Sequence, residues 1–174
     1  MTTFRLSSEG DVAQILPLID QAKAYLASQG IDQWQDGYPN GDVVHEDIRL
    51  GQGYVLEEDG QVLGILTLVF GGEPTYEAIY DGAWTTPEPY ACFHRIAVSA
   101  AARGKGVADA MMQGAEAIAR EKGMAGVRID THHDNIVMQR MLMRNGFVPC
   151  GTIYLQGGQE HGAPRLALEK ALSN

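Results

Sequence analysis

The chain has 174 residues, of which 45% are hydrophobic, and this suits a single domain with one core over residues 1–174. Thirteen basic against twenty-two acidic residues give a net charge of −9, so the basic surface that nucleic-acid binding needs is missing and we expect no nucleic-acid partner. No apolar run of about eighteen residues and no signal segment occur, and with only two cysteines we expect a cytoplasmic protein without a membrane partner.

The first third of the chain predicts a strand and two helices. Residues 4–6 read as a strand, and Ser8 can cap a helix whose apolar residues recur at helical spacing up to Leu26. Pro17 within this pattern predicts a kink or a late start. After the polar loop 32–39, Asn40 or Asp42 can cap a short helix that reaches Leu50.

The middle of the chain predicts a hairpin, a long loop and a third strand of the same sheet. Residues 54–57 and 62–70 read as strands joined at Asp59-Gly60, a strong hairpin signal. Residues 71–89 form a long loop with a helical turn near Tyr76, and residues 90–98 form a strand.

The last part alternates helices and strands. Helices are predicted over 104–122 and 135–144, the second ended by Asn145-Gly146, and strands over 127–131, 148–155 and 164–169. The order is therefore β-α-α-β-β-β-α-β-α-β-β. Because it combines hairpins with strand–helix–strand crossovers, we expect a mixed sheet of the α/β (α+β) class.

One segment carries a chemical signal: the strand that ends in Ile96-Ala97-Val98 leads through a glycine-rich turn directly into a helix. The turn reads Arg103-Gly104-Lys105-Gly106-Val107-Ala108. A helix N-terminus presents amide N–H groups and the positive end of the helix dipole, and glycines let an anion approach them closely. This pattern predicts a pyrophosphate site. The alternative is that the two glycines only permit close packing of strand and helix.

Two other phosphate-binding patterns do not fit. A P-loop requires Ser or Thr directly after its lysine, and here Gly106 follows Lys105. A dinucleotide fingerprint requires a third glycine where Asp109 stands, and its turn follows an early strand, not one past mid-chain.

The turn resembles the R/Q-x-x-G-x-G/A signature of the GCN5-related N-acetyltransferases (GNAT), through Arg103, Gly106 and Ala108. The element order also matches that family, and residues 135–147 are similar to its later asparagine-led helix that ends in Gly-Phe. The resemblance spans nearly the whole chain. It implies the GNAT fold, a central mixed and mostly antiparallel sheet of about seven strands flanked by four helices.

The resemblance also implies a function and its residues. It implies direct transfer of an acetyl group from acetyl-CoA to a primary amine of a small molecule or peptide, without a metal. The backbone of Ile96, Ala97 and Val98 would position the pantetheine arm, the amides from Arg103 to Ala108 would hold the pyrophosphate, and Asn135 would contact the coenzyme. Many members carry a tyrosine as general acid where this chain has Leu142. A departing thiol with a pKa of about 8.5 can leave unaided near neutral pH.

Two histidines are candidates for the base that removes the amine proton. His94 alternates with Cys92 and Ile96 on the strand at the thioester end, and its imidazole suits the task; the alternative is a histidine packed in the sheet. His132 shares a strand face with Asp130, which could orient it. Adjacent His132 and His133 point opposite ways on a strand, so we expect no metal site, and Asp134 or Asn135 can simply cap the next helix.

The acceptor is expected near the loop between the first two helices, which lines the acceptor site in this family. Trp34 and Tyr38, beside Asp32 and Asp36, would suit a cationic amine, although Trp34 can equally pin the loop to the core. The loop 71–89 would form the opposite wall, or be an exposed or dimer-contacting insertion, which leaves a homodimer open. Two alternatives to an acetyltransferase remain: a non-catalytic acyl-CoA sensor and, within enzymes, an acyltransferase that uses a longer acyl donor.

Overall fold

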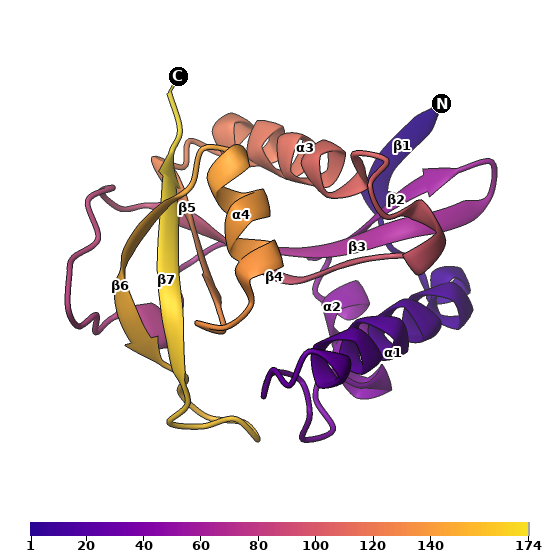
Figure 1. The fold of residues 1–174 in the computed structure, drawn as a ribbon. Coiled ribbons are helices and arrows are strands. Elements are labelled where there is room, and N and C mark those ends of the chain that lie inside the picture. The colour runs from indigo at the N-terminus through magenta and orange to yellow at the C-terminus, as the bar shows by residue number, and fades with distance from the viewer. Residues whose placement is uncertain (174) are drawn as a thin grey trace. The chain divides into compact units, whose positions relative to one another are not determined.

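The structure is a computed structural model, in which residues 1–173 are described. The helices and strands follow the predicted order (Figure 1): β1 (Thr2–Leu6), α1 (Val12–Ser28), α2 (Gly41–Arg49), β2 (Gly53–Glu58), β3 (Gln61–Val69), β4 (Tyr90–Val98), α3 (Val107–Glu121), β5 (Gly126–Thr131), α4 (Ile136–Arg144), β6 (Val148–Tyr154) and β7 (Pro164–Ala171). The strands form one sheet of order β1-β2-β3-β4-β5-β7-β6. The β4–β5 pair is parallel, whereas β1–β2, β2–β3, β5–β7 and β6–β7 are antiparallel. The mixed, mostly antiparallel sheet with four helices is therefore confirmed within the described residues.

The chain forms two compact units. Unit 1 consists of Met1–Leu68 and His94–Ala115, and unit 2 consists of Val69–Phe93 and residues 116–173. Strand β4 starts in unit 2 and ends in unit 1, and helix α3 starts in unit 1 and ends in unit 2.

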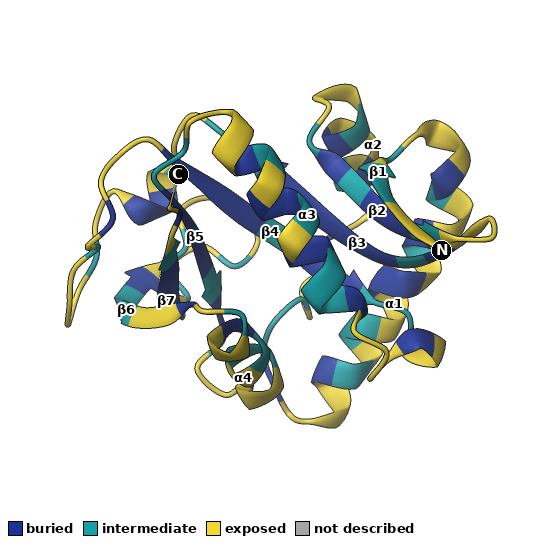
Figure 2. Ribbon diagram, turned by 90° about the horizontal axis from the view of Figure 1, so that it is seen from above, coloured by how far each residue is buried: buried dark blue, intermediate teal, exposed yellow. Residues whose placement is uncertain are grey.

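In unit 1, helices cover both faces of the sheet. Ile65 on β3 belongs to a core cluster with Val62 of the same strand and residues of α1, α2, β2 and β4: Ile15, Leu18, Ile19, Val44, Val55 and Ala97. Its neighbour Gly64 faces the other way, since a Cβ there would lie 2.8 Å from Met111 and 2.9 Å from Val107 on α3. Figure 1 shows α1 and α2 on one side of β3 and α3 on the other, and Figure 2 shows most of β3 as buried.

Pro17 does not delay the first helix, so the predicted late start is wrong. A 3₁₀ turn, η1 (Glu9–Asp11), leads into α1 at Val12, and Pro17 lies inside the helix. Proline lacks the N–H that would bond the carbonyl four residues earlier, on Ala13. Both residues are exposed, so water can bond that carbonyl and the cost is small.

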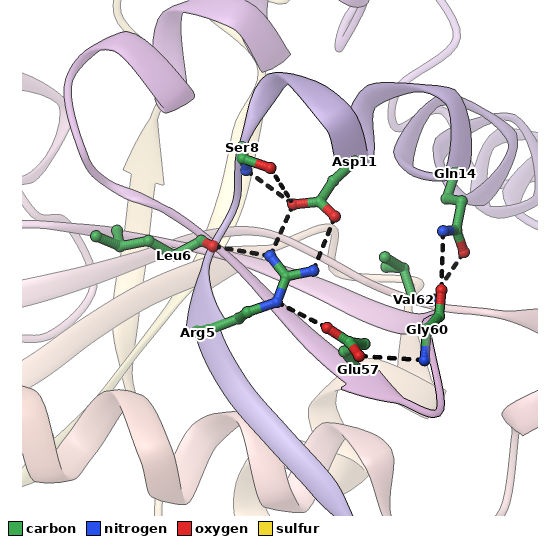
Figure 3. A network of polar contacts seen from close by, with 8 residues as sticks. All are labelled: Arg5, Leu6, Ser8, Asp11, Gln14, Glu57, Gly60 and Val62. Atoms are coloured by element: carbon green, nitrogen blue, oxygen red, sulfur yellow. Dashed lines mark hydrogen bonds and ion pairs between the residues drawn. The ribbon is translucent and has the colours of Figure 1, made fainter.

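A polar network ties β1 to the start of α1 and to β2 (Figure 3). The Arg5 guanidinium donates to both oxygens of Asp11, at 2.8 and 2.9 Å, and to Glu57 at 2.8 Å. The backbone N–H of Ser8 donates to the same Asp11 carboxylate at 2.8 Å. The hydrogen bonds from Arg5 hold the pKa of Asp11 at about 2, against an ordinary value of 3.8.

Helix α3 begins three residues later than predicted. Gly104 and Gly106 both have left-handed backbone angles, so residues 103–106 form a turn and the helix starts at Val107. A 3₁₀ turn, η3 (Ala100–Ala102), connects this turn to β4. Apart from the start of α1, which η1 precedes, the other predicted boundaries lie within two residues of the observed ones. The turn near Tyr76 is present as η2 (Pro74–Tyr76).

In unit 2, the loop 71–89 is docked against strand β6. Tyr80 and Thr152 exchange backbone hydrogen bonds of 2.9 and 2.8 Å, and Ala83 N–H donates to Cys150 O at 3.0 Å. A Cβ on Gly82 would lie 1.8 Å from Cys150 O, so only glycine permits this approach. The loop is thus an attached part of unit 2.

Candidate active site

Two glycines build the turn between β4 and α3. Gly104 and Gly106 each have a φ of 76°, a region that only glycine adopts without strain. A Cβ at either position would meet no atom within 4 Å. Backbone conformation therefore requires glycine here, and the alternative that these residues only allow close packing is wrong.

The turn presents its backbone at the N-terminus of a 15-residue helix. Lys105 N–H donates to Ala102 O at 3.3 Å, and Ala110 N–H donates to Gly106 O at 3.0 Å, which closes the turn onto the first helical residues. Residues 103–106 are exposed. First-turn amides lack a helical acceptor and lie at the positive end of the helix dipole, so this exposed turn can bind an anion.

The side chains around the turn differ in their surroundings. The Arg103 guanidinium lies 4.7 Å from the centre of the Tyr25 ring on α1, which orients this cation. Lys105 is exposed. Val107 is buried and packs toward Gly64, so of Val107 only the backbone can serve a ligand. Ala108, half-buried, follows it in the first helical turn.

The end of β4 is mostly buried and anchored on one side. Ile96 and Ala97 are buried and Val98 is half-buried, and Ser99 N–H donates to Leu63 O on β3 at 2.8 Å. Among the described residues, the parallel register of β4 with β5 covers only Tyr90–Cys92. The later residues of β4 lie beyond this register, which suits backbone pairing with an extended ligand.

His94 is half-buried on β4, but the strand is irregular next to it. Arg95 has a φ of 48°, a left-handed backbone angle that interrupts the regular strand, and we call this point the bulge of β4. The regular alternation predicted for Cys92, His94 and Ile96 is therefore interrupted between the last two residues. The side chain directions expected from a simple strand do not hold there.

Three hydrogen bonds organise the cluster at the end of β5. Asp130 accepts a 2.7 Å hydrogen bond from the Tyr76 hydroxyl, and His132 Nδ1 accepts one of 3.0 Å from Asp134 N–H. The buried side chain of Asn135 caps α4 by accepting from Met138 N–H at 3.2 Å. The capping interpretation is thus confirmed for Asn135.

The loop before α2 holds both expected acceptor residues. Trp34 is half-buried, has a φ of 61° and packs against the core cluster of unit 1, as expected of a residue that pins the loop. Tyr38 is also half-buried, and its hydroxyl accepts a 2.6 Å hydrogen bond from Arg95 Nη1. Asp32 and Asp36 are exposed, so the loop has a negative outer surface.

Sequence reasoning missed the buried pair of Arg95 and Asp47. Arg95 Nε and Nη2 donate to the two oxygens of Asp47 at 2.8 and 2.6 Å. Thr67 and Gln52 donate to the same carboxylate at 2.9 and 3.0 Å. An arginine inside the stretch 90–98, which is apolar apart from His94, is the signal in the sequence that could have indicated such a partner.

Two further residues are closed to direct chemistry. Leu142, in place of the usual tyrosine, has no exposed surface. Cys92 is 1% exposed, and burial raises the pKa of its thiol, so it stays protonated. The interpretation of Cys92 as a small buried hydrophobe is therefore supported.

The predicted site residues divide between the two units. Unit 2 holds His132 and Asn135. Unit 1 brings together the turn, the end of β4 and the loop before α2, that is, Trp34, Tyr38, His94, Ile96, Ala97, Val98, Arg103, Gly104, Lys105, Gly106, Val107 and Ala108.

Unit 2 also carries a pocket of about 500 Å³ between the docked loop and the end of β6. The rings of Tyr80 and Tyr154, both on its wall, meet edge to face with centres 5.4 Å apart. Glu77 adds a carboxylate and Gln156 an amide. This pocket could not be predicted from the sequence, because its two walls lie far apart along the chain.

Residues 1–173 contain neither a candidate membrane-spanning helix nor a candidate metal site. None of the helices in this range is both long and apolar enough to span a membrane. Within the same range, no three or more His, Cys, Asp or Glu side chains are grouped so that they could hold a metal ion.

Comparisons with known proteins agree with this geometry. The family model for the acetyltransferase (GNAT) family matches residues 19–147. A GNAT family acetyltransferase structure from Streptococcus agalactiae shares 36% identity with a TM-score of 0.87, covering 99% of this chain and 96% of that one. A putative acetyltransferase from Staphylococcus aureus shares 23% identity with a TM-score of 0.73, covering 98% and 99%.

A more distant structure is the PaiA N-acetyltransferase from Thermoplasma acidophilum in complex with coenzyme A, with 15% identity, a TM-score of 0.69 and 99% of both chains covered. A comparison with curated proteins gave no match. The family model covers well over half of the chain, and its matched range contains the β4–α3 turn and helix α4. The chain therefore belongs to the acetyltransferase (GNAT) family.

Proposed function

We propose that this protein is an acetyl-CoA-dependent N-acetyltransferase, a single domain that moves the acetyl group directly to a primary amine of a small molecule or peptide. One observation carries the proposal: the exposed turn at Gly104 and Gly106 is left-handed, uncrowded and leads directly into α3. The structural neighbour in complex with coenzyme A supports the choice of donor.

The residues of the turn fit a coenzyme with a pyrophosphate. The space where Cβ atoms would stand at Gly104 and Gly106 is open, so the anion can reach the amides from Arg103 to Ala108. The backbone of Ile96, Ala97 and Val98 would pair with the extended arm, and Asn135 would contact the coenzyme besides capping α4. Acetyl-CoA supplies the activated acetyl thioester.

His94 is proposed as the base. An amine attacks a thioester only as the neutral species, so a group near the acceptor must take up its proton. His94 is half-buried next to the bulge at Arg95 and lies on the strand that would hold the coenzyme arm. His132 is the second candidate, although the Tyr76 hydroxyl occupies one oxygen of Asp130.

The acceptor is proposed to enter beside the loop 32–39. Trp34 and Tyr38 offer aromatic surface, and the exposed Asp32 and Asp36 attract a cation before it loses its proton. The net charge of −9 has the same effect on basic peptides. Both cysteines are free, which supports a reducing compartment such as the cytoplasm.

Leu142 bears on the alternative functions. Because a fully buried leucine cannot donate a proton, the thiolate would leave unaided, with a pKa of about 8.5 for the free thiol. The same residue favours, as a second candidate, a sensor that binds acyl-CoA without turnover. An acyltransferase with a longer acyl donor stays within the same chemistry.

Thermal unfolding and thiol release test the proposal. Acetyl-CoA should raise Tm, because a ligand that binds only the folded state stabilises it. Gly106→Glu should abolish the shift by placing a carboxylate at the pyrophosphate. Gly123→Glu is a matched control, since Gly123 has a φ of 75°, similarly open surroundings and a place at the opposite end of α3.

A panel of amines and peptides, read by release of the CoA thiol, then separates enzyme from sensor. Release with at least one acceptor class establishes the transferase, and comparing acetyl with longer acyl donors establishes the chain length. An equal Tm shift in wild type and Gly106→Glu would move the coenzyme site elsewhere.

A further inference from the structure

Arg95 combines two unfavourable features at one position of β4. It is not glycine, yet its φ is 48°, a strained backbone for an L-residue. Its side chain is a charged group with only 13% of its surface exposed. The left-handed backbone and the buried charge both cost free energy, and they persist only where the surroundings fix the residue firmly.

The surroundings of Arg95 are an ordered set of hydrogen bonds within unit 1. Asp47 binds the guanidinium through both of its oxygens, the bidentate geometry that is strongest for this pair. Burial lowers the pKa of Arg95, but its hydrogen bonds to Asp47 and Tyr38 and the charges of these partners together outweigh burial and raise the pKa, so the arginine stays charged. Thr67 and Gln52 satisfy the remaining lone pairs of Asp47.

The third bond of Arg95 reaches a different element. Nη1 donates to the Tyr38 hydroxyl at 2.6 Å, and Tyr38 stands at the end of the loop that also contains Trp34. A single guanidinium thus connects α2 through Asp47, the loop 32–39 through Tyr38, and the bulge of β4 through its own backbone. Its chain neighbours are His94 and Ile96, one proposed as base and the other as coenzyme contact.

We infer that Arg95 is a positioning residue that locks the loop 32–39 to the bulge of β4, so that the acceptor loop and His94 keep one fixed geometry. The inference rests on the proposed function, which assigns the acceptor to loop 32–39 and the base to His94. Stability alone does not explain the pair, because buried ion pairs of this kind are commonly replaceable by apolar residues without loss of stability.

Tyr38→Phe is the first test, since it removes the bond to the loop and leaves the Arg95–Asp47 pair in place. Amide hydrogen exchange should increase in segments 32–39 and 93–98, whereas α1 and β2 should exchange as before. The acceptor KM should rise about tenfold, the order expected for a bond to a charged donor, with acetyl-CoA KM within about twofold. Tyr54→Phe is the matched control: Tyr54 stacks on Phe4 in the same unit, and its exchange and kinetics should not change.

The double variant Arg95→Met with Asp47→Leu tests the same point without leaving a lone buried charge. It should fold, with acetyl-CoA still raising Tm, but should lose about tenfold or more in kcat/KM for the acceptor. Arg95→Lys keeps the positive charge but not the two parallel hydrogen bonds of the guanidinium, so its kcat/KM for the acceptor should lie between those of the wild type and the double variant.

Two results would overturn the inference. One is an increase in exchange limited to 32–39 with acceptor kinetics unchanged; the other is full activity of the double variant. Because exchange is measured without turnover, failure of the proposed function itself, seen as no thiol release by the wild type, remains distinguishable.

Discussion

The hydroxyl of Tyr76 donates a 2.7 Å hydrogen bond to Asp130 Oδ2, which ties the 3₁₀ turn η2 to strand β5. Burial, followed by the nearby charge of Asp130, raises the pKa of Tyr76, so the phenol remains a donor throughout the neutral range. Tyr76→Phe should lower the free energy of unfolding by about 1.5–3 kcal/mol, the range for bonds to charged groups. Urea unfolding at neutral pH measures this.

Tyr80→Phe is the comparison for that measurement. Tyr80 is 52% exposed, so loss of its hydroxyl should change the unfolding free energy by less than about 0.5 kcal/mol. Equal effects of the two variants would show that the Tyr76–Asp130 bond contributes nothing specific.

His94→Gln should lower kcat by about 10²–10⁴-fold, because glutamine retains hydrogen bonding but cannot take up the amine proton. Acetyl-CoA binding should be little changed. The dependence of kcat/KM on pH should change shape, because the group that takes up the proton is lost. His132→Gln should keep both rate and profile. The opposite pattern in the two variants would assign the base to His132. If neither variant changed the rate or the pH profile, an ordered water chain would be the group that takes up the proton.

Trp34→Ala separates packing from binding at the acceptor loop. Because Trp34 is half-buried against the core of unit 1, its loss should cost about 2 kcal/mol of unfolding free energy, below the 3–5 kcal/mol of a fully buried tryptophan. The acceptor KM should also rise, with acetyl-CoA binding intact. Trp84→Ala, in unit 2, should lower stability through its lost 2.9 Å bond to Tyr76 O and leave the acceptor KM as it was. A Trp34 variant with unchanged KM would restrict this residue to pinning the loop.

Acid should weaken both units through one carboxylate in each. Hydrogen bonds from Arg5 hold the pKa of Asp11 at about 2. Burial raises the pKa of Glu169, but hydrogen bonds from Thr85 and Thr86 outweigh the effect of burial and hold this pKa at about 2 as well. Their ordinary values are 3.8 and 4.5, so both contribute stability that is complete above pH 4.5 and is lost as pH falls toward 2. Unfolding free energy measured across this window should fall less steeply in Asp11→Asn and in Glu169→Gln. A slope identical to wild type in both variants would contradict this assignment.

The sequence predicted local features well because they are encoded in short patterns. Strand β4 over residues 90–98 and the Asp59-Gly60 hairpin match the prediction, and the glycine turn stands where it was expected. The same glycines explain the late start of α3, since left-handed residues cannot belong to the helix.

The Arg95–Asp47–Tyr38 network could not be predicted from the sequence, for two physical reasons. Arg95 lies far along the chain from both Asp47 and Tyr38. In addition, no local sequence pattern predicts a left-handed backbone for an arginine within a strand. Side-chain directions at His94 depend on that bulge, so alternation alone gave an incomplete picture of the candidate base.

The docking of loop 71–89 has a consequence for how copies of this protein meet. Strand β6 is an edge strand of the sheet, and an exposed edge strand is a template for pairing with another chain and for aggregation. Tyr80 and Ala83 already occupy backbone groups of Thr152 and Cys150, and Gly82 makes the approach close enough. The loop thus guards this edge, and a dimer formed by continuing the sheet through that part of β6 would first have to displace it.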